Sequence, residues 1–190
     1  MQARGRGLST SVLQQETPIM SLACYSAQEH LRDGRLVKVR ALRPDDETSM
    51  LVAIDRTGTE SLKRRFFAPK RWFSDAETAF FMNVDFVNHV ALVAEIDEDG
   101  KSAIIGGGRY VVVEPGQAEI AFIVVDAYQR QRLGTILVRH IVGLARAAGL
   151  ERLSADVLPE NVVMLNVLGK FGFQIHSMDS QVAHLTLALV

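Results

Sequence analysis

Three consecutive strand-like segments followed by one long amphipathic helix constrain the fold of this chain more than any other feature. The segments are VALVAEI, SAIIGGGRYVVV and AEIAFIVV, and they are separated by DEDGK and EPGQ. Runs rich in β-branched residues are typical of strands, and short stretches with Gly, Pro and Asp are typical of turns. The pattern therefore predicts an antiparallel meander between residues 90 and 125.

The segment after the meander has helical periodicity. Its apolar residues recur three or four positions apart and form one stripe: Leu133, Leu137, Ile141, Leu144 and Ala148. Such a stripe is typical of a helix that packs one face against a core, and a glycine just past the stripe is a stop signal. We therefore predict a helix that begins near Gln131 and ends at Gly149.

The other segments alternate between the two patterns. In chain order they are a strand (35–44), three helices (45–58, 59–67, 74–84) and, after the long helix, a strand (152–158), a helix (161–172) and two terminal strands (173–178, 181–190). Arg40 falls on the exposed face of the first strand, and Thr59, Ser74 and Asn161 are predicted N-caps. This order predicts an α+β fold with one mixed sheet.

Composition and charge narrow the class of protein. The 190 residues, 48% of them hydrophobic, suffice for one domain with a sizeable core. Lys and Arg number 21 against 22 for Asp and Glu, a balance that gives no sign of a nucleic-acid or anionic-membrane binder. No apolar run approaches the roughly 18 residues of a membrane span. We predict a flexible N-terminal extension over residues 1–30 and one domain over residues 31–190.

Metal and disulfide chemistry find little support in the sequence. Cys24 is the only cysteine, which excludes an internal disulfide framework and a Cys-rich zinc site and fits a reducing, cytoplasmic location. The five histidines share no metal-ligand spacing, and His140 and His184 are interpreted as structural. We therefore predict no metal site.

A candidate anion site lies where the meander joins the long helix, in the sequence YQRQRLGTIL. A helix N-terminus attracts anions, because it has unpaired N–H donors and the positive end of the helix dipole. Successive N–H groups from Arg130 through Thr135 are suited to form a nest around a diphosphate. Gly134 leaves room for a close approach, and Arg130 and Arg132 add positive charge. An ordinary surface helix with solvated arginines is the alternative interpretation of this motif alone.

A second segment, LSADVLPENVVMLNVLGKFGF, favours the functional interpretation. With YQRQRLGTIL it resembles the GNAT superfamily of N-acetyltransferases, from about Leu36 to the C-terminus. The first motif resembles the family's Gln/Arg-x-x-Gly-x-Gly/Ala pyrophosphate loop, with Arg132 in place of its first glycine. Arg132 donates the same backbone N–H if its φ stays negative. The second motif resembles the family's Asn-x-x-Ala-x-x-x-Tyr-x-Lys-x-Gly-Phe helix, at Asn161, Lys170, Gly172 and Phe173. The resemblance implies a three-layer α/β/α fold around a mixed, mostly antiparallel sheet.

Three further segments resemble the catalytic domain of bacterial Pat-type protein-lysine acetyltransferases: YSAQEHLRDGRLVKVRALRPDDE, ESLKRRFF and AEIAFIVVDAYQRQRLGT. This resemblance implies direct acetyl transfer from acetyl-CoA to a protein lysine, with Glu119 as general base. It also implies that the backbone of Phe122 and Val124 pairs with the pantetheine arm. The residues implied in binding acetyl-CoA are Phe122, Ile123, Val124, Gln129, Arg130, Gln131, Arg132, Leu133, Gly134, Thr135 and Asn161.

Several alternatives stay open at the level of sequence. A small amine is a second candidate acceptor, although no cluster of acids that would suit a polyamine is evident. A module that senses acyl-CoA without turnover is a third, because Leu168 occupies the place of the family's thiol-protonating tyrosine. Tyr128 is interpreted as packing, and Glu119 as a solvated strand end is the alternative to a base.

Partners are predicted on the same grounds. In this superfamily the helices after the first strand shape the acceptor cleft, so Phe66, Phe67 and Trp72 are candidate wall residues. The terminal strand is a candidate edge at which two copies pair as a homodimer. We expect no nucleic-acid and no membrane partner.

Overall fold

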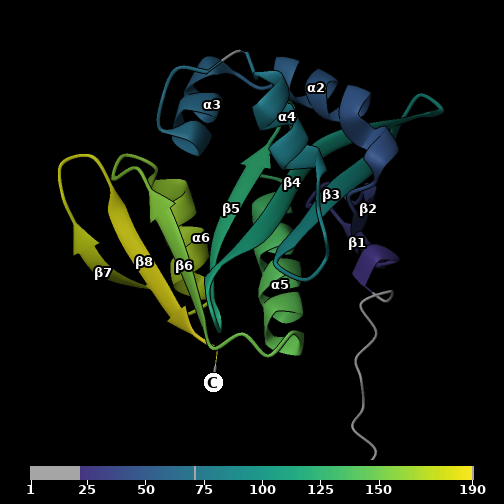
Figure 1. The fold of residues 1–190 in the computed structure, drawn as a ribbon. Helices are drawn as coiled ribbons and strands as arrows, with labels where there is room; N and C mark the ends of the chain where they lie inside the picture. The colour runs from purple at the N-terminus through teal and green to yellow at the C-terminus, as the bar shows by residue number, and fades with distance from the viewer. Residues whose placement is uncertain (1–21, 71, 190) are drawn as a thin grey trace, which may run out of the picture.

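The computed structural model describes residues 22–70 and 72–189. One eight-stranded sheet organises them, in the order β1-β2-β3-β4-β5-β6-β8-β7 (Figure 1). The strands are β1 (Ser26–His30), β2 (Leu36–Ala41), β3 (His89–Glu98), β4 (Lys101–Glu114), β5 (Gln117–Val124), β6 (Arg152–Val157), β7 (Gln174–Met178) and β8 (Ala183–Ala188). The helices are η1 (Pro44–Asp46), α2 (Glu47–Asp55), α3 (Thr59–Phe66), α4 (Asp75–Met82), η2 (Asp126–Tyr128), α5 (Leu133–Ala147) and α6 (Val162–Lys170).

Helices cover both faces of the sheet, which confirms the three-layer α/β/α arrangement. Figure 1 shows α2, α3 and α4 over one face and α5 and α6 over the other. β3, β4 and β5 form the predicted antiparallel meander. β5 and β6 are paired in parallel, whereas every other neighbouring pair in the sheet is antiparallel. The sheet is therefore mixed and mostly antiparallel, as predicted.

The core lies between the sheet and α5. Leu137 and Ile141 from the apolar stripe of α5 are fully buried, and Ile120 and Phe122 of β5 contribute buried side chains to the same cluster. Burying side chains of this size stabilises a fold by about 1.5–3 kcal/mol each. The stripe therefore holds α5 against the middle of the sheet, where its first turn meets the end of β5.

The N-terminal boundary of the domain was predicted too late in the chain. Ser26–His30 form β1, which pairs with β2, so the extension predicted for residues 1–30 does not include them. Residues 1–21 lie outside the described residues. The segment SAQEH escaped prediction because it is polar and lies at the sheet edge, where backbone pairing supplies most of the stabilisation. Its Glu29 also accepts a hydrogen bond from His140 Nε2 at 2.8 Å.

Arg40 is buried, in contrast to its predicted exposure. Its side chain is 6% exposed because Asp46 and Glu95 bind the guanidinium. Nη1 and Nη2 donate to the two carboxylate oxygens of Asp46 at 2.7 and 2.8 Å. An alternating pattern marks a charged residue as exposed, and only the tertiary structure provides the two acids that make burial favourable.

The predicted helix caps were right in two cases of three. Ser74 caps α4 in a capping box with Glu77, and Asn161 caps α6 by accepting from Met164 N–H at 3.3 Å. Thr59 was wrong as a cap, because it already has helical geometry and Gly58 is the N-cap of α3.

The terminal strand is not an edge of the sheet. β8 lies between β6 and β7, so β7 and β1 are the two edge strands among the described residues. Pairing of two copies through the last strand is therefore excluded by its two neighbours. In the described part of the chain no helix is long and apolar enough to cross a membrane.

Candidate acyl-CoA site and acceptor cavity

β5 and β6 diverge in the middle of the sheet. They pair only where Gln117–Glu119 lie beside Arg152–Ser154, and β6 continues against β8 while β5 continues against β4. Figure 1 shows the resulting V-shaped gap, which widens toward α3. Residues 120–124 of β5 therefore have no strand on their β6 side in the described structure. Their backbone groups on that side are candidates to pair with an extended ligand that has amide groups.

The loop after β5 has an unusual backbone. Arg130 has φ 60° and Arg132 has φ 69°, both in the left-handed region. The expectation that φ of Arg132 stays negative is wrong, and α5 begins at Leu133 rather than near Gln131. The reason is geometric, since the chain must reverse from the loop into the helix axis within two residues. A left-handed residue followed by helical ones turns successive N–H groups toward one side, which is the geometry of an anion-binding nest.

The donors of this nest are available. Arg132, the N-cap of α5, makes no side-chain capping bond, and the first turn of α5 contains no acid. A Cβ added at Gly134 would meet nothing within 4 Å, so open space lies beside the first turn. The loop therefore has the geometry of an anion site, with the N–H groups of residues 133–135 as candidate donors.

Several predicted binding residues offer only their backbone. The side chains of Phe122 and Leu133 are 8% and 1% exposed and belong to the core. Ile123, Val124 and Thr135 are half-buried. Hydrogen bonding through peptide groups is compatible with burial of these side chains, because the ligand would pair along the strand and the helix turn.

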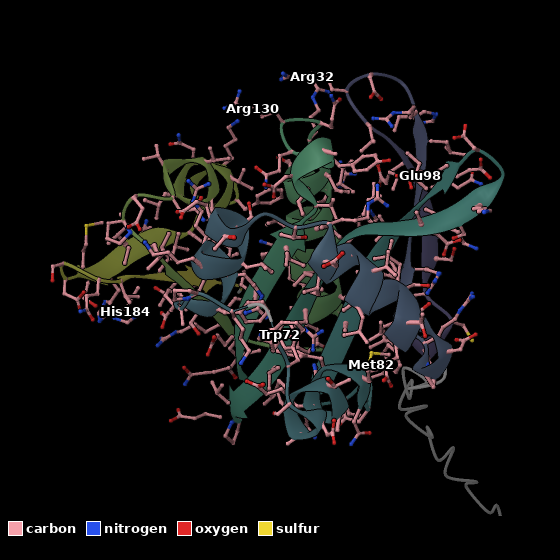
Figure 2. The ribbon with its side chains drawn as sticks, turned by 90° about the horizontal axis from the view of Figure 1, so that it is seen from above. Arg32, Trp72, Met82, Glu98, Arg130 and His184 are labelled. Carbon is pink, nitrogen blue, oxygen red and sulfur yellow. The ribbon has the colours of Figure 1, made fainter. Side chains whose placement is uncertain are left out.

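The side chain of Gln129 holds the loop in place. Its Nε2 donates to Ser61 Oγ at 2.9 Å, to Asp126 Oδ1 at 3.0 Å and to Val124 O at 3.3 Å. These bonds tie the loop to α3 and to the end of β5. The β1–β2 hairpin supports the loop from the other side, where Arg32 N–H donates to Gln131 O at 3.1 Å. Figure 2 shows the Arg32 and Arg130 side chains near each other at this end of the molecule.

Tyr128 also supports the loop. It is 5% exposed, and its hydroxyl donates to Glu98, whose carboxylate binds Arg56 at 2.6 and 3.0 Å. Burial raises the pKa of Tyr128, and the bond to Glu98 raises it further. A phenol held in this way is a poor acid, so the interpretation of Tyr128 as packing is confirmed.

Glu119 lies where β5 and β6 separate. It pairs with Val111 of β4 on one side and Ser154 of β6 on the other, and it is the last residue of β5 with a β6 partner. The side chain is exposed and makes no ion pair with the described residues. Because strand residues alternate between faces, Glu119, Ala121 and Ile123 point to the face covered by α2–α4.

A cavity lies on this same face. It has a volume of about 60 Å³ and lies between α2–α4 and strands β3–β5. Aromatic and thioether side chains dominate the helical wall, at Met50, Phe66, Phe73, Phe81 and Met82. Phe66 was a predicted wall residue and lines the cavity. Phe67 and Trp72, predicted alongside it, are 42% and 87% exposed and do not belong to the lining (Figure 2).

Gly107 and Gly108, from a triple glycine that was not interpreted at the level of sequence, line the cavity and leave no room for a side chain. A Cβ at Gly107 would come within 2.9 Å of Leu92 O, and one at Gly108 would come within 2.6 Å of Phe122 Cδ1. A run of three glycines inside a strand was the available signal, since glycine in a strand often marks a close approach.

Two arginines line the cavity, and the sequence analysis assigned neither of them to it. Arg109 of β4 donates from Nη1 to His89 Nε2 at 2.9 Å and to Phe81 O at 3.3 Å, and it is 8% exposed. Burial lowers the pKa of Arg109 to about 9, and the charge of Arg65 acts in the same direction. Burial lowers the pKa of Arg65 to about 10, while nearby Glu119 acts in the opposite direction. Both guanidinium groups are therefore charged at neutral pH.

His89 is neutral beside Arg109. Burial lowers its pKa first, and the Arg109 charge lowers it further. Because a guanidinium only donates, Nε2 of His89 must be the unprotonated nitrogen. The ring also stacks on Phe80, with centroids 5.1 Å apart. His89 therefore positions Arg109 and holds no proton at Nε2.

The second motif contributes less to the site than the first. The Oδ1 of Asn161 is committed to capping α6, so its part in binding acetyl-CoA stays a prediction. Leu168 is 1% exposed and lies in the core. The helix therefore supports the fold at the position where the family motif has tyrosine.

Comparison with known proteins decides the family. The acetyltransferase (GNAT) family matches residues 57–173, more than half of the chain. This chain belongs to the GNAT acetyltransferase family. GNAT acetyltransferases use acetyl-CoA as acyl donor.

Individual relatives agree with this assignment. The GNAT domain of PAT from S. lividans superposes with a TM-score of 0.78 at 32% identity, over 86% of this chain and 96% of that one. Acetyltransferase PA5475 of Pseudomonas aeruginosa is 32% identical over 146 residues, 76% of this chain and 78% of its own length. Acetyltransferase Pat of Mycolicibacterium smegmatis is 27% identical over 75% of this chain but only 42% of its own length. YncA of Salmonella typhimurium, solved with acetyl-CoA, shares the fold at 15% identity and a TM-score of 0.66.

Proposed function

We propose that this enzyme transfers an acetyl group from acetyl-CoA directly to the primary amine of a protein lysine, with Glu119 as general base. The position of Glu119 carries the proposal. It is the last paired residue before β5 and β6 separate, and its strand face borders the cavity. A carboxylate at this point is within reach of an amine that approaches a thioester held along residues 120–124 of β5.

The proposed reaction needs one deprotonation before bond formation. A lysine amine is almost wholly protonated at neutral pH, so Glu119 takes one proton from the ammonium group. The amine nitrogen then bonds to the thioester carbonyl carbon, and a backbone N–H of β5 at Val124 stabilises the oxyanion. The C–S bond breaks, coenzyme A leaves as a thiolate, and the second amine proton or water converts it to the thiol.

The acyl donor is proposed to bind along β5 and α5. The backbone of Phe122, Ile123 and Val124 would pair with the pantetheine amides in the strand gap. The N–H groups from Arg130 through Thr135 would hold the diphosphate, with the Arg130 and Arg132 side chains adding charge. In this arrangement Gln129 and Gln131 keep the loop in shape through their contacts with Ser61 and Arg32.

The surface around the cavity supports a protein acceptor. Large apolar side chains are exposed on α2–α4 and the adjoining loops, at Leu51, Val52, Phe67, Trp72, Phe80 and Val87. Clusters of exposed apolar residues are typical of protein-binding surfaces. Among the lining residues Glu47 is the one acid, whereas a polyamine site needs several. The unpaired Cys24 supports a cytoplasmic location, and a homodimer would have to form elsewhere than at β8.

Replacement of Glu119 by Gln tests the base. We expect kcat to fall about 10²- to 10⁴-fold, because general-base catalysis contributes that much, while the Kd for acetyl-CoA is unchanged. Glu114→Gln, an exposed acid at the end of β4, is the matched control and should retain full turnover. Unchanged turnover in Glu119→Gln would refute the assignment of the base.

The same measurement separates an enzyme from a sensor of acyl-CoA. A buried Leu168 in place of a proton donor is the observation that favours a sensor. A sensor would bind acetyl-CoA but transfer no acetyl group to any lysine peptide or small amine, and Glu119→Gln would then change nothing.

A further inference from the structure

The cavity lining contains two cations without a carboxylate partner among the described residues, Arg109, which is buried, and Arg65, which is half-buried. In the described part of the chain neither Arg65 nor Arg109 forms an ion pair, whereas buried Arg40 is paired with two acids. Glu47 is the acid in the lining, and its side chain is exposed. Glu119 is close enough to influence Arg65 but lies beyond ion-pair distance.

The two guanidinium groups rest on neighbouring aromatic rings. Arg65 lies 4.8 Å from the centroid of Phe66, and Arg109 lies 4.8 Å from the centroid of Phe81. The Phe66 and Phe81 centroids are 5.9 Å apart. Stacking of this kind orients a guanidinium plane and leaves its edge free to donate hydrogen bonds.

Arg109 lines the cavity and retains donors that make no hydrogen bond to the described residues. All its hydrogen bonds to described residues come from Nη1, so Nη2 and Nε are uncommitted. Neither nitrogen is among the enclosed side-chain atoms that lack a hydrogen-bond partner, so each keeps some exposed surface. His89 fixes the guanidinium in this orientation, because it accepts from Nη1 and stacks on Phe80.

Burial of an unpaired cation is unfavourable unless a ligand compensates it. A charged group taken out of water costs several kcal/mol, and a bidentate carboxylate is the partner that a guanidinium favours. An apolar cavity that retains two such groups is therefore suited to a ligand with an apolar body and an anionic end.

We propose that Arg65 and Arg109 bind a substrate carboxylate in this cavity. The inference rests on the proposed function in one respect, since it takes the cavity beside Glu119 as the transfer site. The carboxylate has two sources: the far end of a dicarboxylic acyl group on coenzyme A, or an acidic acceptor. The acyl source is favoured, because Ala121 and Ile123 of β5 line both the cavity and the stretch assigned to the thioester.

The chemistry of transfer is unchanged for an acidic acyl group. The amine nitrogen bonds to the thioester carbonyl carbon, the C–S bond breaks and coenzyme A leaves as the thiol. The distal carboxylate takes no part in bond making and serves only to hold the acyl chain between the two arginines.

Binding of two stable thioethers tests the inference without turnover. S-(3-carboxypropyl)-coenzyme A and S-butyl-coenzyme A differ in one carboxylate, and isothermal titration gives the Kd of each. We expect the carboxylate to tighten binding about 10- to 100-fold, the range for charge-assisted hydrogen bonds. Arg109→Met and Arg65→Met should each reduce this preference and leave the Kd of S-butyl-coenzyme A unchanged. Arg146→Met, an exposed arginine of α5, is the control and should keep the preference.

A second arm identifies an acidic acceptor. If the two thioethers bind equally, glutarate is titrated into the protein saturated with acetyl-CoA, and binding that Arg109→Met abolishes supports the acceptor source. Should either Met variant fail to fold, Arg109→Lys and Arg65→Lys keep the charge but lose the bidentate geometry, and a weaker preference is expected. A wild-type protein that shows neither the thioether preference nor glutarate binding overturns the inference.

The experiments distinguish an error in the assignment of Glu119 as base from an error in the carboxylate site. The thioether titrations are repeated with Glu119→Gln, in which the carboxylate preference should persist because the residue is not a ligand of the carboxylate. Normal turnover in that variant would refute Glu119 as base while the preference stands. A different outcome would support the base and overturn the carboxylate site. In that outcome Glu119→Gln loses turnover, the two thioethers bind with equal Kd, and glutarate does not bind.

Discussion

Arg132 carries backbone strain at the point where the loop turns into α5. Its φ of 69° lies in the left-handed region, which costs a residue with a Cβ about 1–2 kcal/mol relative to right-handed geometry. Glycine avoids that cost but loses about 0.5–1 kcal/mol through the flexibility of the unfolded chain. The residue is exposed and makes no capping bond, so its contribution to folding is dominated by these two terms.

Two substitutions separate the backbone of Arg132 from its charge. Arg132→Gly and Arg132→Ala both remove the guanidinium, but only glycine relieves the strain. We expect the Gly variant to exceed the Ala variant by up to about 1 kcal/mol in free energy of unfolding, measured with urea. The Kd for acetyl-CoA should rise equally in the two variants if the guanidinium charge contributes to binding. A Gly variant less stable than the Ala variant would contradict the strain.

Asp46 is a second residue whose contribution is local. Burial alone would raise its pKa, and the hydrogen bonds from Arg40 and from Arg43 N–H lower it below its usual value. A depressed carboxyl pKa stabilises the fold above the unfolded pKa of about 3.9, and this stabilisation is lost as pH falls through the folded value.

Replacement of Asp46 by Asn leaves the Arg40 charge without one of its acids. We expect a loss of about 3 kcal/mol in unfolding free energy at pH 7, because breaking a buried pair strands its partner. The difference from the parent should begin to narrow below about pH 4, where the unfolded parent takes up a proton at Asp46, and should narrow further as pH falls toward the lower folded pKa. Urea unfolding at pH 7 and at pH 3 measures both. A difference that is constant with pH would refute the ionic origin.

At the scale of elements, two glycines differ in the space that a side chain would have, one in a strand and one in a helix. A Cβ at Gly108 of β4 would come within 2.6 Å of the Phe122 ring, and one at Gly143 of α5 would meet nothing within 4 Å. We expect Gly108→Ala to destabilise by about 1–3 kcal/mol through overpacking, and Gly143→Ala to stabilise by about 1 kcal/mol through helix propensity. Thermal unfolding of both variants checks the signs. If Gly108→Ala leaves the stability unchanged, the backbones of β4 and β5 shift enough to accommodate the added methyl group.

Regular elements followed from the sequence wherever one pattern ran for long enough. The meander and α5 were predicted because each buries a continuous apolar face. β1 was missed because its residues alternate between exposed and half-buried without large apolar side chains. The predicted start of α5 was two residues too early, because no sequence pattern indicates the left-handed backbone at Arg132.

The site was predictable to the extent that its motifs are local. The proposed diphosphate loop lies within six residues, so helix polarity and the resemblance of its motif pointed to it. The cavity combines Arg65 of α3 with Arg109 of β4, which are far apart in sequence. Only the packing of α3 over the sheet brings these two arginines to one cavity, so no periodicity or spacing could reveal the pair.

At the scale of the whole molecule, a ligand that binds at the gap between β5 and β6 joins the two halves of the sheet. The parallel pairing there spans only three residues of each strand, so the halves otherwise depend on α5 and the core. An acyl-CoA that contacts β5 and the first turn of α5 should therefore stabilise the fold as a unit. At 100 times its Kd, a ligand that binds only the folded state adds about 2.7 kcal/mol.

Substitution at Gly134 tests this linkage. Because a Cβ at this position meets nothing within 4 Å, Gly134→Asp should fold, and a carboxylate in the first turn of α5 should stabilise the unliganded protein by about 0.3–1 kcal/mol. The same carboxylate occupies the proposed place of the diphosphate and repels it. We therefore expect a higher Tm than the parent without acetyl-CoA and no increase when acetyl-CoA is added, whereas the parent shifts upward. Gly134→Asn, equal in size and uncharged, should recover part of the shift. An equal shift in the parent and the Asp variant would place the diphosphate away from this helix turn.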